Sequence, residues 1–274
     1  MGDGFRVAGY FSLIPDAARR LDPFLMLDYH PPYTYEPAAR ARGVGVHPHR
    51  GFETVTLAWQ GRVAHHDSSG GGGVIGPGDV QWMTAASGVL HKEYHEESFA
   101  RQGGTFHMAQ LWVNLPAKHK MDPPRYQALT ASQMGQVALP NAAGHVRIIA
   151  GEYAGTRGPA LTFSPMSVLD VHVNAAAPFH LPIPPSWNAA ALVMKGDVTL
   201  PGGERAAQND FIVFGKGGDH IEMEAGTDTQ LLVLCGEPLA EPIVQYGPFV
   251  MNTKREIEQA FLDLQQGKFG QLED

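Results

Sequence analysis

The amino-acid sequence predicts an all-β protein with two similar halves. Turn residues recur about every 8–12 residues over most of the chain, and short runs rich in β-branched and aromatic residues lie between them. This spacing is typical of a β-sandwich or β-barrel. The 32 glycines and 21 prolines among the 274 residues together exceed the usual share of about 12%, as expected for short strands joined by tight turns.

In the first half, residues 52–59 and 108–115 are clear strand candidates. In the second half, the strand candidates are residues 161–163, 167–173, 190–194, 197–200, 210–214 and 230–235. Between the two regions, residues 116–144 are polar and contain Pro123-Pro124 and Pro140. We expect this segment to be a connector with irregular structure.

A weak internal repeat supports the division into two halves. Residues 60–63 followed by 76–80 resemble residues 195–198 followed by 209–212. In both, a strand ends in glycine, a hairpin follows, and a turn with aspartate opens the next strand. We therefore expect one domain over residues 1–134 and a second over residues 135–274.

One helix is predicted near the C-terminal end, and we assign it to the second domain. Thr253 and Glu256 have the spacing of a capping box. The residues that follow form one apolar face, with a glycine that can end the helix: Ile257, Ala260, Phe261, Leu264 and Gly267.

Composition narrows the function classes. The formal net charge is −8, whereas binding a nucleic-acid backbone requires a basic face. The single cysteine, Cys235, lies in an apolar run, which favours a buried, inert thiol over a disulfide or a nucleophile. No stretch has the about 18 apolar residues of a membrane span, so we expect a cytoplasmic protein without a nucleic-acid or membrane partner.

Histidines are concentrated in the first half. Seven of the 13 lie between residues 47 and 107. Two segments there, His47-Pro48-His49 and His91-Lys92-Glu93, each place two polar side chains at i and i+2. In a strand such residues project to the same side.

If these segments are neighbouring strands, three imidazoles and one carboxylate converge inside a barrel. Burying four polar groups there is costly unless something satisfies them, and a divalent metal does so directly. Nitrogen and oxygen donors suit Fe, Mn, Co, Ni, Cu or Zn better than Ca or Mg. Pro48 lacks an N–H, so we expect it on an edge strand, at a bulge or at the start of a strand. The alternative for each pair is the polar face of a solvated strand.

The chain also resembles the pirin family of bicupins. The resemblance is carried by residues 47–56, 73–85 and 87–91, and also by 21–28, 110–116, 123–126 and 246–252. It implies two tandem cupin (jelly-roll) β-barrels with a short C-terminal helix. It also implies a metal, usually iron as Fe(II), in the N-terminal barrel, held by His47, His49, His91 and Glu93. The second barrel is expected to be metal-free, although His220-Ile221-Glu222 has the required spacing.

Glu53 competes with Glu93 as the carboxylate ligand, because the wider cupin pattern places a ligand four residues after the second histidine. We prefer Glu93 as ligand and treat Glu53 as a residue that orients a ligand. His65, His66 and Asp67 fit contacts to the ligands and solvent-facing positions equally well.

The resemblance implies two alternative functions. One is a quercetin 2,3-dioxygenase, which opens flavonols with O2, with Glu93 in a possible base role and Phe52, Trp82 and Met83 as an apolar wall for the substrate; Phe24 and Met26 are further candidates for that wall. The other is a non-enzymatic, iron-binding regulatory protein that meets a protein partner. An inert structural bicupin is a third interpretation.

Overall fold

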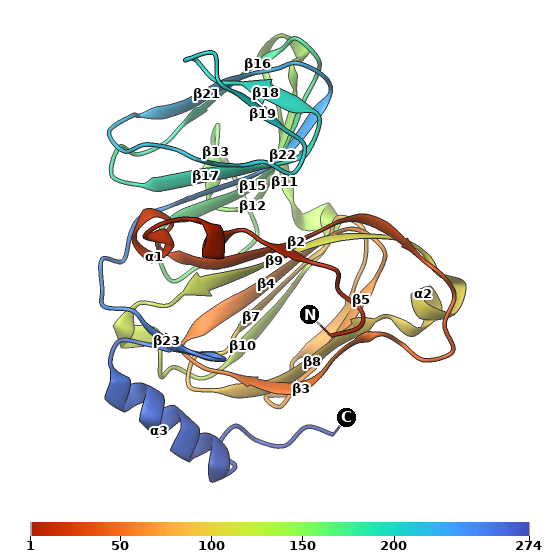
Figure 1. Ribbon diagram of the computed structural model, residues 1–274, viewed down its shortest axis with the longest axis vertical. Helices are drawn as coiled ribbons and strands as arrows, with labels where there is room; N and C mark the ends of the chain where they lie inside the picture. Colours follow the sequence, from red (N-terminus) through yellow and green to blue (C-terminus); the bar gives the residue numbers. More distant parts are fainter. Residues whose placement is uncertain (1, 274) are drawn as a thin grey trace. The chain divides into compact units, whose positions relative to one another are not determined.

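The computed structural model describes residues 2–273 and confirms the all-β fold. Its contacts divide the chain into two units, which are described separately. The first unit comprises residues 2–15, 24–131 and 240–273, and the second comprises residues 16–23 and 132–239. Figure 1 shows strands as the main elements of both units.

The first unit contains two antiparallel sheets. The six-stranded sheet has the order β1 (Ala8–Gly9), β2 (Phe24–Tyr35), β9 (Gly104–Asn114), β4 (Phe52–Gln60), β7 (Val80–Thr84) and β10 (Arg125–Leu129). The four-stranded sheet has the order β3 (Gly43–His49), β8 (Val89–His95), β5 (Val63–Asp67) and β6 (Gly72–Ile75). The two sheets share an interior, because side chains of β4, β7 and β9 hydrogen-bond a side chain of β8.

Residues 240–273 group with the first unit, whereas the sequence analysis assigned the terminal helix to the second half. The segment forms the hairpin β23 (Val244–Tyr246) and β24 (Phe249–Met251), followed by α3 (Lys254–Gln265). This segment groups with the first unit because a buried ion pair joins its Asp263 to Arg50, with 2.8 Å between Oδ2 and Nη1. Leu90 of β8 also packs against the apolar cluster that this segment forms with Phe249, Ile257 and Phe269.

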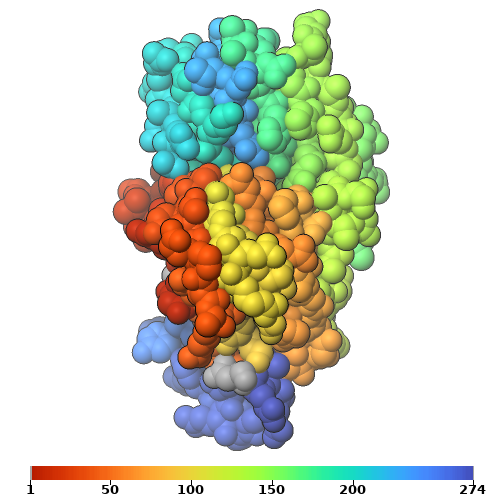
Figure 2. All heavy atoms as spheres, turned by 90° about the vertical axis from the view of Figure 1, so that its right-hand side faces the viewer, coloured from red at the N-terminus to blue at the C-terminus, as the bar shows by residue number. Residues whose placement is uncertain are grey.

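The predicted capping box of α3 is present. Glu256 N donates to Thr253 Oγ1 over 3.2 Å, and Asn252 N donates back to the Glu256 carboxylate. The other helices are α1 (Ala17–Arg20) in the second unit and α2 (Glu97–Gln102) in the first. Figure 2 shows α2 (yellow) at the surface beside residues near 40 (orange-red), where Ala38 N donates to Ala100 O.

The second unit repeats the two-sheet plan with antiparallel pairing. Its six-stranded sheet has the order β11 (Gly135–Ala138), β12 (Gly144–Ala150), β15 (Met166–Val173), β22 (Thr229–Gly236), β17 (Asn188–Lys195) and β20 (Phe211–Val213). Its four-stranded sheet has the order β16 (Pro178–Pro182), β21 (His220–Ala225), β18 (Asp197–Thr199) and β19 (Arg205–Ala207), and β13 (Glu152–Tyr153) pairs with β14 (Thr156–Arg157).

The predicted irregular connector is more ordered than expected. Residues 116–144 contain β10, which pairs with β7, and β11, which pairs with β12. Short 3-10 segments separate these strands, and another precedes α1: Phe11–Leu13, Ala117–His119, Ala131–Gln133 and Pro140–Ala142.

Candidate metal centre

Strands β3 and β8 are neighbours and bring the predicted histidines together. His47 lies directly opposite His91 in the antiparallel pairing, and His49 lies opposite Val89. The ring centroid of His91 is 4.1 Å from that of His47 and 4.8 Å from that of His49. Donor atoms of these three side chains all lie within 4.8 Å of one another. Three of the four residues that alternation selected from sequence therefore lie together.

Pro48 lies where its missing N–H is tolerated. Strand β3 is an edge strand of its sheet, and its pairing with β8 is irregular between Val44 and His47. Both features agree with the prediction made from the proline.

Backbone carbonyls determine which nitrogen of two histidines faces the cluster. His47 Nδ1 lies 2.8 Å from Gly45 O, and His49 Nδ1 lies 3.4 Å from Pro248 O. A carbonyl oxygen only accepts, so Nδ1 carries the proton in both rings and Nε2 keeps its lone pair. This orientation by an outer partner is usual for metal-bound histidines.

Burial keeps the imidazoles of His49 and His91 neutral. Desolvation, with the nearby His47 ring as a second cause, lowers the pKa of His49 to about 3. Desolvation and the neighbouring histidines also lower the pKa of His91 well below its ordinary value. The Nε2 atom of His91 is buried and has no hydrogen-bond partner in the described structure. A buried, unpaired nitrogen beside two others fits a divalent metal ion, because only neutral imidazole coordinates.

Glu93 is buried next to this group. Its donor atoms group with those of His91 and His65 rather than with those of His47 and His49. Oε1 accepts hydrogen bonds from Thr56 Oγ1 (3.1 Å) and Gln81 Nε2 (2.8 Å), whereas Oε2 accepts one from Gln110 Nε2 (2.7 Å). Since a carboxylate oxygen has two lone pairs, Oε2 keeps one lone pair for a ligand.

His65 is a site residue that the sequence analysis did not select. It lies opposite Glu93 in the β5–β8 pairing and is fully buried, while His66 is exposed. Its Nε2 atom lies 3.2 Å from Asp67 Oδ2. Burial raises the pKa of Asp67, but hydrogen bonds from His65 and Ser69 outweigh it and lower the value to about 2. The sequence contained a signal for this contact, because Asp67 follows His65 at i+2 and the two side chains therefore lie on the same side of their strand.

Phe52 and Met83 lie on the face of the six-stranded sheet that points toward Glu93 and the histidines of the four-stranded sheet. Thr56 and Gln81 bond Glu93 from strands β4 and β7, and Phe52 and Met83 lie an even number of residues from them. The Phe52 ring is 5.0 Å from His49 between centroids. Trp112, which we did not select, is 4.2 Å from Phe52 and 5.2 Å from His49.

Trp82 and Glu53 lie on the opposite face, so the expected roles as substrate wall and ligand-orienting residue need correction. Thr84 Oγ1 donates to Glu53 Oε1 over 2.7 Å, and Thr84 shares its strand face with Trp82. Desolvation raises the pKa of Glu53 to about 7, although hydrogen bonds from Thr84 and Trp82 oppose the shift. The nearest guanidinium nitrogen, of Arg125, is 4.0 Å away.

In the second unit, His220 and Glu222 have the i, i+2 spacing expected of metal ligands, but both side chains are exposed. His220 Nε2 lies 3.7 Å from Glu222 Oε2 on β21, and both groups of donors that could hold a metal ion lie in the first unit among the described residues. That the second barrel binds no metal stays a prediction.

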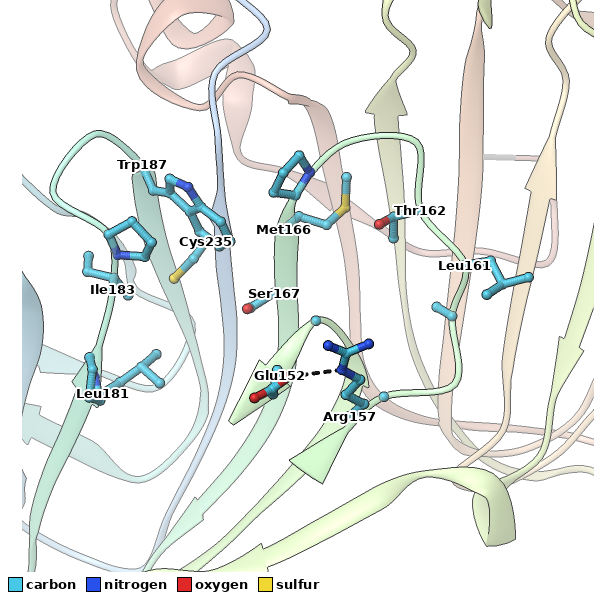
Figure 3. A pocket seen from close by; sticks show the side chains of 16 residues that line it. Glu152, Arg157, Leu161, Thr162, Met166, Ser167, Leu181, Ile183, Trp187 and Cys235 are labelled. Atoms are coloured by element: carbon cyan, nitrogen blue, oxygen red, sulfur yellow. Dashed lines mark hydrogen bonds and ion pairs between the residues drawn. The ribbon is translucent and has the colours of Figure 1, made fainter. Parts of the chain in front are cut away.

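The second unit contains a cavity of about 580 Å³, and Figure 3 shows the side chains that line it. Apolar side chains line most of it, including Trp187 and Met166, and the Glu152–Arg157 ion pair lies on one side. The Cys235 thiol at its wall has its pKa raised to about 12 by burial, which agrees with an inert thiol.

No helix among residues 2–273 is long and apolar enough to cross a membrane.

Comparisons with known proteins agree with the two-barrel fold. The family model "Pirin" matches residues 4–113, and the model "Pirin C-terminal cupin domain" matches residues 168–270. A "putative quercetin 2,3-dioxygenase" of Pseudomonas aeruginosa is 51% identical over 98% of this chain and 93% of its own length. Human "Pirin" is 37% identical over 92% of this chain and 84% of its own length.

Among solved structures, the quercetin 2,3-dioxygenase from Acinetobacter baumannii superposes with a TM-score of 0.95 at 48% identity. The match covers 100% of this chain and 94% of that one. The two family models, the curated relatives and this superposition agree over nearly the whole length. The chain therefore belongs to the pirin family of bicupins.

Proposed function

We propose that the protein is a metal-dependent dioxygenase that cleaves flavonols such as quercetin with O2. The observation that carries the proposal is the convergence of three imidazoles, of which His49 and His91 are buried and neutral, beside a buried carboxylate. The substrate class comes from the similarity to the "putative quercetin 2,3-dioxygenase" at 51% identity and to the quercetin 2,3-dioxygenase at 48% identity.

In this proposal, His47, His49 and His91 hold one divalent metal ion and Glu93 is the fourth ligand. Iron as Fe(II) is our first candidate, and Mn, Co, Ni, Cu or Zn are alternatives because they accept the same nitrogen and oxygen donors. When bound, the ion would supply Lewis-acid and redox chemistry toward the flavonol and O2. The half-buried His47 would lie nearest to solvent.

Glu93 would also act as the base of the reaction. Gln81 and Thr56 occupy the lone pairs of Oε1, whereas Oε2 accepts a hydrogen bond from Gln110 alone among the described residues. When Glu93 is not bound to the metal, the remaining lone pair of Oε2 can take the proton of a flavonol hydroxyl. The three donors hold the carboxylate in place while it does so, and Gln110 stabilises the charge of Oε2 before the transfer.

Phe52, Met83 and Trp112 would bind the flat rings of the substrate. Phe52 and Trp112 are inclined by 33° and lie beside His49, so they form one aromatic surface next to the candidate ligands. Met83 extends the apolar face on β7. An apolar surface with a few fixed polar groups is the usual composition of a small-molecule site.

The test is O2 consumption with quercetin by protein loaded separately with each candidate metal, together with loss of the flavonol absorption. We expect turnover with at least one metal. His49→Ala should abolish it, and Glu93→Gln should reduce it while the fold is retained. His66→Gln, at an exposed neighbouring position of β5, is the matched control and should behave as wild type.

The outcome also decides between the two functions that the family suggests. Metal-loaded protein that consumes no O2 with any of the six metals would contradict the dioxygenase proposal. A partner protein captured only in one oxidation state of bound iron, without turnover, would favour a regulatory protein instead.

A further inference from the structure

We propose that Asp67 and His65 set the tautomer of His91 and thereby keep the Nε2 atom of His91 free to bind the metal. Both would be positioning residues rather than ligands. The inference rests on the metal site of the proposed function, but not on the proposed reaction.

The first step is the orientation of Asp67. Oδ1 accepts hydrogen bonds from Ser69 N (2.9 Å), Ser69 Oγ (2.6 Å) and Gly71 N (2.9 Å). Oδ2 is therefore directed elsewhere and lies 3.2 Å from His65 Nε2. A carboxylate oxygen accepts a hydrogen bond, so His65 must carry its proton on Nε2.

The second step is the role of Gln81. Its Nε2 atom lies 2.8 Å from Glu93 Oε1 and 3.1 Å from His65 Nδ1. Tyr126 Oη donates to Gln81 Oε1 over 3.4 Å, which agrees with this orientation of the amide. The two amide protons of Gln81 thus have two acceptors, Glu93 and His65. His65 Nδ1 therefore accepts a hydrogen bond from Gln81, which agrees with a proton on Nε2 of the same ring.

The third step is the contact between the two histidines. His91 Nδ1 lies 3.4 Å from His65 Nδ1. If both atoms lacked a proton, two lone pairs would face each other in a buried site. A proton on His91 Nδ1 replaces this repulsion by a hydrogen bond to His65 Nδ1. Gln81 Nε2 donates to the same nitrogen. His91 Nε2 is left unprotonated.

The result matches the requirement of the metal centre. His91 Nε2 is buried without a partner in the described structure, so no other group fixes its protonation. The Tyr126 ring stacks on His65 with 5.1 Å between centroids and an interplanar angle of 17°, which holds the plane of the imidazole. His47 and His49 use backbone carbonyls for the same purpose, whereas His91 uses a side-chain pair.

The direct test is the tautomer of each histidine in the metal-free wild-type protein, measured by long-range 1H–15N NMR after 15N-histidine labelling. We expect the protonated nitrogen to be Nδ1 in His91 and Nε2 in His65. The opposite tautomer of His91 would overturn the proposal. This measurement needs neither a variant nor turnover.

Asp67→Asn tests the chain of contacts with minimal change of shape. The asparagine oxygen can still accept from Ser69 and Gly71, so its amide N–H faces His65 Nε2. His65 should then move its proton to Nδ1, and His91 should in turn be protonated on Nε2. Because loss of an outer partner typically lowers metal affinity by about 10–100-fold, we expect a loss in that range for Ni2+, measured by chelator competition.

His66→Gln is the control on the same strand, with unchanged Ni2+ affinity expected. If Asp67→Asn does not fold, His65→Gln replaces it, with the same expected loss. A folded variant with wild-type Ni2+ affinity would overturn the proposal. A wild-type protein with the expected tautomers but no O2 uptake would contradict the proposed function and leave this inference standing.

Discussion

Glu53→Gln should remove a pH dependence of stability that comes from a carboxyl group buried on the face of the six-stranded sheet that points away from the candidate metal ligands. Burial raises the pKa of Glu53 from its ordinary value of 4.5 to about 7. The folded protein therefore binds this proton more tightly than the unfolded chain does. Its contribution to stability is fully present below pH 4.5 and is lost as the pH rises through about 7.

The pKa difference of about 2.5 between the two states corresponds to about 3 kcal/mol. Glutamine has nearly the same shape, can still accept from Thr84 and does not titrate. The unfolding free energy of wild type minus that of the variant should therefore fall by about 3 kcal/mol between pH 4 and pH 8. The histidines titrate in both proteins, so their effects cancel in the difference.

The assay is urea unfolding of the metal-free proteins at several pH values across this range. Glu258→Gln, at an exposed position of α3, is the control and should show no such trend. If the wild-type-minus-variant difference stays constant from pH 4 to pH 8, the reasoning about Glu53 is refuted.

Three further predictions concern the ligands and the buried charges. His49→Ala should lower Ni2+ affinity by more than about 100-fold, because losing even an outer partner costs about 10–100-fold; chelator competition measures it, and wild-type affinity would exclude His49 as a ligand. Lys120→Met should lower the free energy of unfolding by about 3 kcal/mol or more, because Gly51 O, Val250 O and Asn114 Oδ1 all lose a buried ammonium donor. Urea unfolding measures this loss, and Lys118→Met, at an exposed position, should leave the free energy of unfolding unchanged. Asp263→Ala should lower the free energy of unfolding by about 3–5 kcal/mol, because it leaves the Arg50 guanidinium buried without its carboxylate partner. An unchanged urea denaturation midpoint would contradict this prediction.

That the strand of His47 and His49 lies beside the strand of His91 is a long-range pairing, which the sequence analysis could only assume and the family resemblance supported. Strand alternation and the chemistry of one proline predicted that His47 and His49 share a face of an edge or irregular strand. Both depend only on neighbouring residues, so they can be derived from local sequence. The capping box of α3 is local in the same way, and it was also predicted correctly.

The faces of Glu53 and Trp82 could not be predicted, because the chain changes sheets between His49 and Phe52. Gly51 has a φ of +90°, and a Cβ there would lie 1.9 Å from Val250 O. This turn resets the alternation, so counting residues from His49 gives no information about the side on which Glu53 lies.

The position of His65 depends on long-range pairing. His65-His66-Asp67 suits a solvated strand equally well, and only the register of β5 against β8 places His65 beside Glu93 and Asp67 beside His91. The grouping of α3 with the first unit likewise depends on the Arg50–Asp263 pair, whose members are 213 positions apart.

The proline between the two candidate ligands of β3 also affects how the molecule meets other chains. An edge strand normally offers a row of free N–H groups on which a foreign strand can assemble. At Pro48 that row is interrupted, since proline has no N–H to give. A foreign β-strand would therefore find no donor at the position between His47 and His49, which limits assembly along this edge.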